Sequence, residues 1–261
     1  MSDLTASGLQ PLHGHGWRAG LSPLMRAGFG AWWRTREWWT QALLWTVVIN
    51  GSVAVAVWGD APEDLGVFGL YGVMTMFAAI AVAILMQEEI VGEKRSGTAA
   101  WVLSKPASRD AFLLSKLVPN AVGVVATMIA IPSAVLLVQT LLAGVEVSVP
   151  RFALGALVPA LNLLFYLTLT LMLGTLFDSA GPVIAIPLAF AFGQQLVAGI
   201  PGLGMVLPWA LVVGTADSDT SVTGAIITGQ PIPAPLALVT TALACAVFVT
   251  VALYKWRRTE L

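Results

Sequence analysis

Six long apolar runs separated by short polar segments dominate the pattern of this chain. Each run lacks Asp, Glu, Lys and Arg over about the 20 residues that a helix needs to cross the hydrocarbon core of a bilayer. A membrane β-barrel would require short segments that alternate in polarity, and these runs do not alternate. The pattern predicts six transmembrane helices, at Gln41–Trp58, Val67–Met86, Leu117–Ala143, Phe152–Phe177, Gly181–Gly199 and Ala234–Tyr254.

Composition supports the same class of protein. Hydrophobic residues make up 57% of the 261 residues and charged residues only 10%, whereas about a quarter of the residues of a soluble domain are charged. We therefore expect an all-α polytopic membrane protein in which residues 1–261 form a single transmembrane domain.

The basic residues predict the orientation of the spans, because loops rich in Lys and Arg stay on the cytoplasmic side. With the N-terminus inside, the chain would have one basic residue outside, Arg151. The other twelve of the 13 would lie inside: Arg18, Arg26, Arg34, Arg36, Lys94, Arg95, Lys105, Arg109, Lys116, Lys255, Arg257 and Arg258. The outer loops would carry Asp60, Glu63, Asp64, Glu146, Asp217 and Asp219. Both termini are predicted to be cytoplasmic, in the cell (plasma or inner) membrane.

One internal block, residues 87–116, interrupts the apolar pattern with charges of both signs and forms the one long cytoplasmic loop between spans. Gly92 and Gly97 would let the chain turn back along the membrane surface. Ser96 or Thr98 would cap a short helix over about residues 96–104.

The end of this block has its own signals. Pro106 would end the short helix, because the residue before a proline disfavours the helical region. Ser108 would then cap the next helix and Asp110 would lie in its first turn, where a negative charge is favourable. The block therefore predicts a short helix across the cytoplasmic mouth, held at each end by a membrane helix.

Several catalytic motifs are missing from the sequence, namely the G-x-x-x-x-G-K-[ST] phosphate loop, the H-E-x-x-H zinc motif and the G-x-S-x-G elbow. The lone Cys245 can form no internal disulfide, and we interpret it as a packing residue. His13 and His15 lack a nearby cluster of Cys or carboxylates, so no metal site is predicted. We expect neither an enzyme nor a bound cofactor on this chain.

The charged block resembles the permease subunits of type-2 ATP-binding-cassette (ABC) transporters. Their hallmark after the second span is a glutamate, Gly-Thr, a short helix, Pro-x-Ser-Arg, and a lysine that opens the third span. The stretch "LTLTLMLGTLFDSAGPVIAIPLAF" is similar to the family's second recognisable region. The resemblance covers essentially the whole chain. The residues that match, in order and at the usual spacing, are Glu93, Gly97, Thr98, Pro106, Ser108, Arg109 and Lys116.

The resemblance implies a mechanism in which ATP and magnesium are bound by a separate ATPase, present in two copies beneath two permeases. The short helix would be the coupling helix that receives the ATPase's motion. The expected coupling residues are Glu93, Arg95, Gly97, Thr98, Trp101, Lys105, Pro106 and Arg109, with Trp101 as the apolar anchor. A membrane-boundary role without coupling is the alternative for these residues. The second permease would complete a homodimer or a heterodimer. We do not expect a nucleic acid as a partner.

Two further segments have counterparts in that family. The arm at residues 1–40 predicts an interfacial helix with Leu21, Met25, Trp32 and Trp39 on one face, similar to the family's elbow helix, or else an ordinary aromatic belt. Residues 200–233 are too long for a turn and are broken by prolines and glycines, so we expect short re-entrant helices on the outer side rather than a seventh span.

Polar residues inside the spans are candidates for a substrate path: Asn50, Asn162, Tyr166, Gln194 and Gln195, with Asn120 and Gln139 as further polar positions. Hydrogen bonding between helices is the alternative for each of them. The spans carry no acidic residue, which argues against a proton-coupled carrier.

The leading expectation is an ABC exporter of a hydrophobic or amphiphilic compound. A mechanotransmitting subunit, which drives an extracytoplasmic partner without moving cargo itself, would share every motif. A membrane-embedded enzyme is the most distant class.

Overall fold

A computed structural model describes residues 16–58, 66–200, 202–215, 218 and 220–259. Among these residues, six helical segments are long and apolar enough to cross a membrane, and none of the described residues forms a strand beyond an isolated bridge. The six segments are Glu37–Trp58, Val67–Arg95, Arg109–Leu142, Val149–Leu176, Ala180–Val197 and Pro235–Arg258. The prediction of an all-α polytopic membrane protein is confirmed, and the chain is a multi-pass membrane protein.

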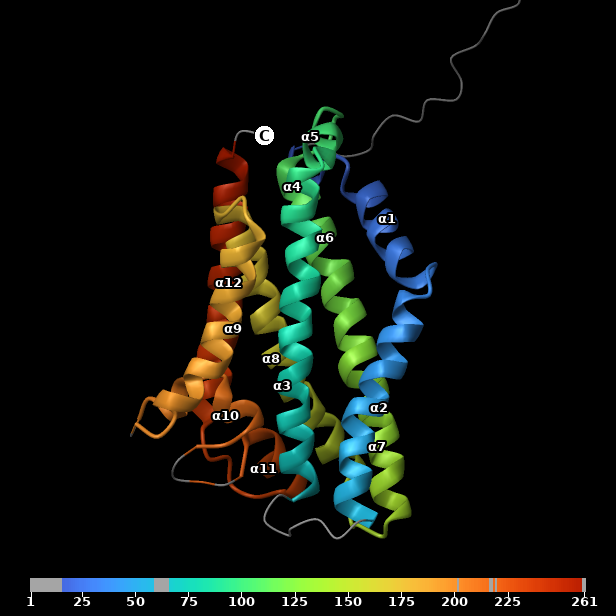
Figure 1. The fold of residues 1–261 in the computed structure, drawn as a ribbon, viewed down its shortest axis with the longest axis vertical. Coiled ribbons are helices and arrows are strands. Elements are labelled where there is room, and N and C mark those ends of the chain that lie inside the picture. The colour runs from blue at the N-terminus through green and yellow to red at the C-terminus, as the bar shows by residue number, and fades with distance from the viewer. Residues whose placement is uncertain (1–15, 59–65, 201, 216–217, 219, 260–261) are drawn as a thin grey trace, which may run out of the picture.

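The elements follow the chain in the order shown in Figure 1. They are η1 Gly16–Arg18, α1 Leu21–Trp33, α2 Glu37–Trp58, α3 Val67–Gln87, η2 Glu88–Gly92, α4 Glu93–Arg95, α5 Thr98–Leu103, α6 Arg109–Val124, η3 Val125–Ala130, α7 Ile131–Leu142, α8 Val149–Leu176, α9 Ala180–Val197, η4 Gly204–Val206, α10 Trp209–Val212, α11 Val222–Thr228 and α12 Pro235–Arg258. The elements η2 and η3 are single π-helical turns that continue α3 into α4 and α6 into α7.

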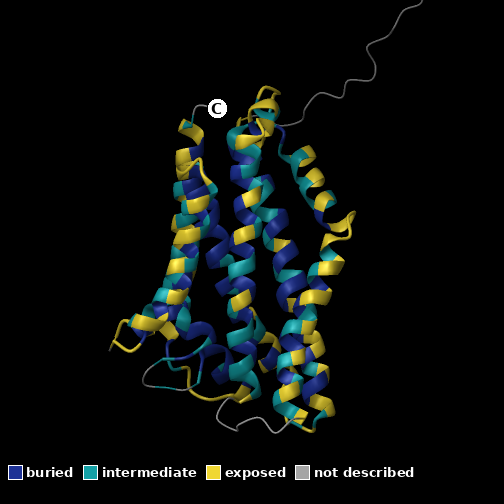
Figure 2. Cartoon of the chain, viewed as in Figure 1, coloured by how far each residue is buried: buried dark blue, intermediate teal, exposed yellow. Residues whose placement is uncertain are grey.

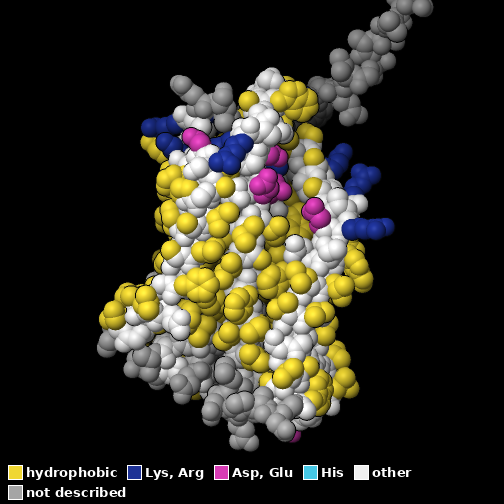
Figure 3. Space-filling model, in the orientation of Figure 1, with side chains coloured by type: hydrophobic (Ala, Val, Ile, Leu, Met, Phe, Trp, Pro, Cys, Tyr) yellow, Lys and Arg dark blue, Asp and Glu magenta, His cyan; other side chains and the backbone are white. Residues whose placement is uncertain are grey.

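Helix α8 is the centre of the bundle. In its most apolar stretch 72% of the residues are buried, compared with 17% in α12 and 22% in α9. It packs against α3, α9, α11 and α12, while α2 packs on α3 and α7 at the other side of the bundle (Figures 1 and 2). Exposed apolar side chains cover the outer faces of these helices (Figure 3), as is typical of helices that span a membrane.

The N-terminal arm differs from its prediction. Residues 34–36 form a bend, so Trp39 belongs to α2 and cannot share one helical face with Leu21. Trp32, expected on one face of an interfacial helix, is buried against α6, and its Nε1 donates to Oδ1 of Asn120 at 2.8 Å. Gly123 permits this contact, because a Cβ there would lie 2.4 Å from the Trp32 ring. A separate N-terminal helix is present, but it is docked on α6 through its tryptophan.

In the part of the segment between α9 and α12 that the structure describes, there are η4, α10 and α11 and no seventh span. Helices α10 and α11 pack against α3 and α8. Thr223 on α11 donates its hydroxyl to the carbonyl of Leu211 on α10 at 2.7 Å, which joins the two short helices. The expectation of short helices rather than another span is confirmed for this region.

Charge is distributed unevenly along the long axis. Figure 3 shows Lys and Arg side chains gathered at the end that carries α5, and Arg151 lies in the first turn of α8, at the opposite end. Five of the acidic residues predicted for the outer loops, together with both histidines, lie outside the described residues: Asp60, Glu63, Asp64, Asp217, Asp219, His13 and His15.

Candidate functional site

The charged block folds as a helical hairpin whose tip is α5. The helix of the second span continues without a break through η2 and α4 to Arg95, and the chain turns at Gly97, whose φ of 75° is the left-handed conformation that glycine tolerates. The prediction of a turn at Gly92 is wrong, because Gly92 is helical and the Glu88 side chain occupies the space beside it.

Both ends of α5 are defined by the backbone. Gly97 is its N-cap residue, so the predicted side-chain cap by Ser96 or Thr98 is wrong; their two hydroxyls instead lie 2.9 Å apart. The helix covers six residues and ends before Pro106, as expected. Ser108 caps α6 by accepting a hydrogen bond from the Ala111 amide at 3.0 Å, which confirms that prediction.

The outer surface of the hairpin tip consists of exposed residues. Trp101 is 62% exposed, and the Nζ of Lys105 lies 3.4 Å from the centroid of its ring, a cation–π contact. On the inner side of α5, Ala99 is buried and Val102 and Leu103 pack against the core. The tip surface is therefore firmly anchored, and six of the eight predicted coupling residues are exposed there: Arg95, Gly97, Thr98, Trp101, Lys105 and Pro106.

The other two predicted coupling residues, Glu93 and Arg109, contact the chain's own helices instead. Glu93 pairs with Lys116 on α6, and Lys116 also lies 2.9 Å from Glu89. Arg109 donates to the carbonyl of Trp256 at 3.2 Å and to that of Thr259 at the end of α12. These two residues brace the hairpin from within.

Two more contacts at the base of the hairpin were not predicted from the sequence. Asp110 accepts a bidentate pair of hydrogen bonds from Arg257 of α12, at 2.8 and 2.7 Å. Asp178, in the short loop between α8 and α9, pairs with Lys94 at 3.0 Å, and its carbonyl accepts from Arg95 at 3.3 Å. The only sequence signal for the second contact was that both segments were expected at the same membrane side.

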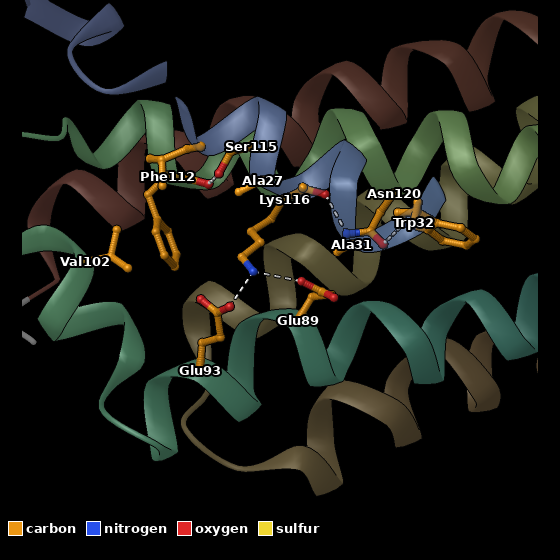
Figure 4. Close-up of a pocket in the computed structure, with 12 residues that line it drawn as sticks. Ala27, Ala31, Trp32, Glu89, Glu93, Val102, Phe112, Ser115, Lys116 and Asn120 are labelled. Carbon is orange, nitrogen blue, oxygen red and sulfur yellow. Dashed lines mark hydrogen bonds and ion pairs between the residues drawn. The ribbon is translucent and has the colours of Figure 1, made fainter. Parts of the chain in front are cut away.

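A cavity of about 370 Å³ lies beneath the hairpin tip, between α1, the α3–η2–α4 helix, α5 and α6. Figure 4 shows Lys116 crossing it toward Glu89 and Glu93, with Trp32 and Asn120 at one end and Phe112 and Val102 at the other. The cavity combines apolar walls with one ammonium and two carboxylates.

Removing the ammonium of Lys116 leaves two carboxylates facing each other without compensation. We expect Lys116→Met to lower the free energy of unfolding by about 2 kcal/mol, measured as a lower thermal midpoint in detergent. The exposed Lys105→Met is the matched control and should shift the midpoint little.

The triple variant Lys116→Met, Glu89→Gln, Glu93→Gln removes the repulsion as well. It should recover part of the loss. Equal midpoints for the single and triple variants would contradict an electrostatic origin.

Most residues predicted for a substrate path form hydrogen bonds between helices. The Asn50 amide donates to the carbonyl of Pro132 at 3.1 Å, and Gln139 donates to the carbonyl of Asn50 at 3.2 Å. The Gln194 amide donates to the Tyr166 hydroxyl at 2.8 Å and its oxygen accepts from the Trp209 amide at 3.0 Å, linking α8, α9 and α10. Asn162 is buried with an amide nitrogen that has no hydrogen-bond partner among the described residues, and Gln195 is exposed.

Comparison with known proteins places the chain in a family. A family described as "Protein of unknown function (DUF2705)" matches residues 57–200, which is more than half of the chain. The chain belongs to the DUF2705 family. No curated protein matches it.

The DUF2705 match has a clear structural extent. It runs from the end of α2 to the segment after α9 and includes the whole hairpin with Lys116 and Asp178. Helices α1 and α12, which cover two sides of the hairpin base, lie outside the match.

Proposed function

We propose that this chain is the membrane-spanning permease subunit of an ATP-driven ABC exporter. The observation that carries the proposal is the hairpin at residues 88–116, with an exposed Trp101 at its tip and a base tied to the α8–α9 loop and to α12. Tryptophan is among the residue types that most often dominate the affinity of protein interfaces.

The base of the hairpin explains how a force on the tip would reach the spans. Lys116 links η2 and α4 to α6, Asp178 links α4 to the α8–α9 loop, and Asp110 links α6 to α12. A displacement of α5 would therefore act on the second, third and sixth spans and on the loop between the fourth and fifth. The π-helical turn η2 lies inside this path, and such turns are frequent at functional sites.

The ordered motif and the charge distribution support the partner and the orientation in this proposal. The resemblance to type-2 ABC permeases implies a separate ATPase. This ATPase would bind ATP and magnesium and would be present in two copies beneath a permease dimer. The basic end that carries α5 would face the cytoplasm, with both termini, under the positive-inside rule. The membrane would be the cell (plasma or inner) membrane.

A hydrophobic or amphiphilic cargo fits the interior. Asn50 and Gln194, two of the polar side chains on the spans, are engaged in hydrogen bonds between helices. A second pocket, of about 330 Å³, lies between α8, α9 and α12. Its lining is almost wholly apolar and includes Phe165, Phe190 and Phe248.

The test is purification of the tagged chain from its native membranes in mild detergent. We expect a second polypeptide with a G-x-x-x-x-G-K-[ST] motif to co-purify, together with ATP hydrolysis. Purification of a pure, stable chain without any such polypeptide, after mild chemical cross-linking in the membrane, would contradict the proposal.

A further inference from the structure

The cavity beneath the hairpin tip has the size and the lining of a small-molecule site. Its volume of about 370 Å³ falls within the range of ligand pockets. Ala27 and Ala31 of α1 are exposed residues of its wall, so the cavity opens at the surface beside α1. Figure 3 shows Asp and Glu side chains beside the hollow between α3 and α1.

The charges in this cavity do not balance. Lys116 brings one positive charge, while Glu89 and Glu93 bring two negative charges. One oxygen of Glu93 bonds Lys116; the other, Oε2, is buried and has no hydrogen-bond partner in the described residues. The other polar groups of the wall have partners, since Asn120 is bonded to Trp32 and to the Lys116 carbonyl. A buried carboxylate oxygen without a donor is costly, and a second cation would satisfy it.

One aromatic ring lies on the same side of the cavity as this carboxylate (Figure 4). In Figure 4 the Phe112 ring and Val102 lie beside the Glu93 carboxylate, and the Trp32 indole closes the far end. The Lys116 ammonium is already 6.0 Å from the Phe112 ring centroid. A carboxylate beside an aromatic face is a favourable environment for an organic ammonium group, and Leu24 and Ala27 extend the wall for an apolar body.

We propose that this cavity binds the ammonium group of an amphiphile, with Glu93 Oε2 as its acceptor and the apolar part lying along α1. The same chemistry could come from an aminolipid headgroup or from a free lipophilic amine. If the proposed function holds, this cavity would be the entry site for cargo from the cytoplasmic leaflet, so that role rests on the proposed function. Binding of the ammonium group does not depend on it.

The experiment uses the full chain in nanodiscs of phosphatidylcholine, without any ATPase. Binding of radiolabelled dodecylamine is measured against empty nanodiscs, and uncharged dodecanol is the matched probe. We expect saturable binding of the amine and none of the alcohol. Glu93→Gln should weaken the binding about tenfold or more, because a charge-assisted hydrogen bond is lost.

Two variants distinguish the site from a folding defect. Ala27→Phe fills the mouth without changing charge and should also abolish saturable binding. Glu88→Gln alters an exposed neighbour that does not line the cavity and should bind as the wild type does. Thermal midpoints are recorded for every variant.

The lipid composition identifies the source of the ammonium group. If dodecylamine binding falls when the nanodiscs contain phosphatidylethanolamine, the proposal is supported with an aminolipid as ligand. If dodecylamine binding is unaffected, the proposal is supported with a free amine as ligand. Equal binding to wild type, Glu93→Gln and Ala27→Phe, or equal binding of dodecanol, would overturn it. Because no ATPase is present, failure here leaves the test of the proposed function untouched.

Discussion

Replacing Trp101 with Ala should weaken the association of the chain with the proposed ATPase about 30-fold or more. Trp101 is 62% exposed at the hairpin tip and is held in place by Lys105. Truncating a central interface tryptophan costs at least about 2 kcal/mol, which corresponds to that factor in affinity. The measurement is the amount of ATPase retained on the immobilised chain as its concentration is lowered.

The control for this prediction is a tryptophan of equal exposure elsewhere. Trp58, at the far end of α2, is 59% exposed, so Trp58→Ala removes the same surface from the opposite end of the molecule. Its retention of the ATPase should match the wild type. Equal losses in both variants, or no loss in Trp101→Ala, would contradict the assignment of the tip as the interface.

Replacing Gly72 with Ala should destabilise the packing of α10 on α3. A Cβ at Gly72 would lie 1.9 Å from the carbonyl oxygen of Val212 and 2.9 Å from its carbonyl carbon. Both are backbone atoms of α10, so no side-chain rotation can relieve the clash and α10 must move. We expect the free energy of unfolding to fall by about 1–3 kcal/mol. The measurement is a lower thermal midpoint.

Gly69 provides the control on the same helix. A Cβ there meets no atom within 4 Å, and alanine is the better helix former. Gly69→Ala should therefore leave the midpoint unchanged or raise it slightly. If Gly72→Ala and Gly69→Ala gave the same midpoint, the close approach of α10 to α3 would be wrong.

The sequence predicted the spans well because one physical quantity, uninterrupted apolar length, determines them. The sequence did not predict where the helices end. The second span was expected to end near Met86, and α3 ends at Gln87, but the helix continues through η2 and α4 to Arg95. There Lys116 on α6 pairs with Glu89 and Glu93 on the charged last turns. Local composition contains no information about a lysine that lies on another helix.

The candidate site also combines local features that the sequence could predict with long-range contacts that it could not. The Ser108 cap and the helix end before Pro106 are local and were predictable. The pairing of Arg257 with Asp110 joins positions 147 residues apart, and periodicity cannot indicate it. The resemblance named Glu93 and Arg109 among the coupling residues, but only the packing of α6 and α12 shows that both contact the chain's own helices.

Site-specific cross-linking tests the central claim, that the α5 tip contacts an ATPase, most directly. Cys245 is the chain's only cysteine, so Cys245→Ser gives a background in which one new thiol can be placed. Ser104→Cys puts it at the exposed end of α5, and Ser148→Cys puts it on an exposed serine at the opposite end, before α8. A thiol–amine cross-linker is then applied to native membranes.

We expect an adduct between position 104 and a polypeptide with the G-x-x-x-x-G-K-[ST] motif, and none from position 148. Absence of that adduct from position 104, or equal yields from both positions, would contradict the account.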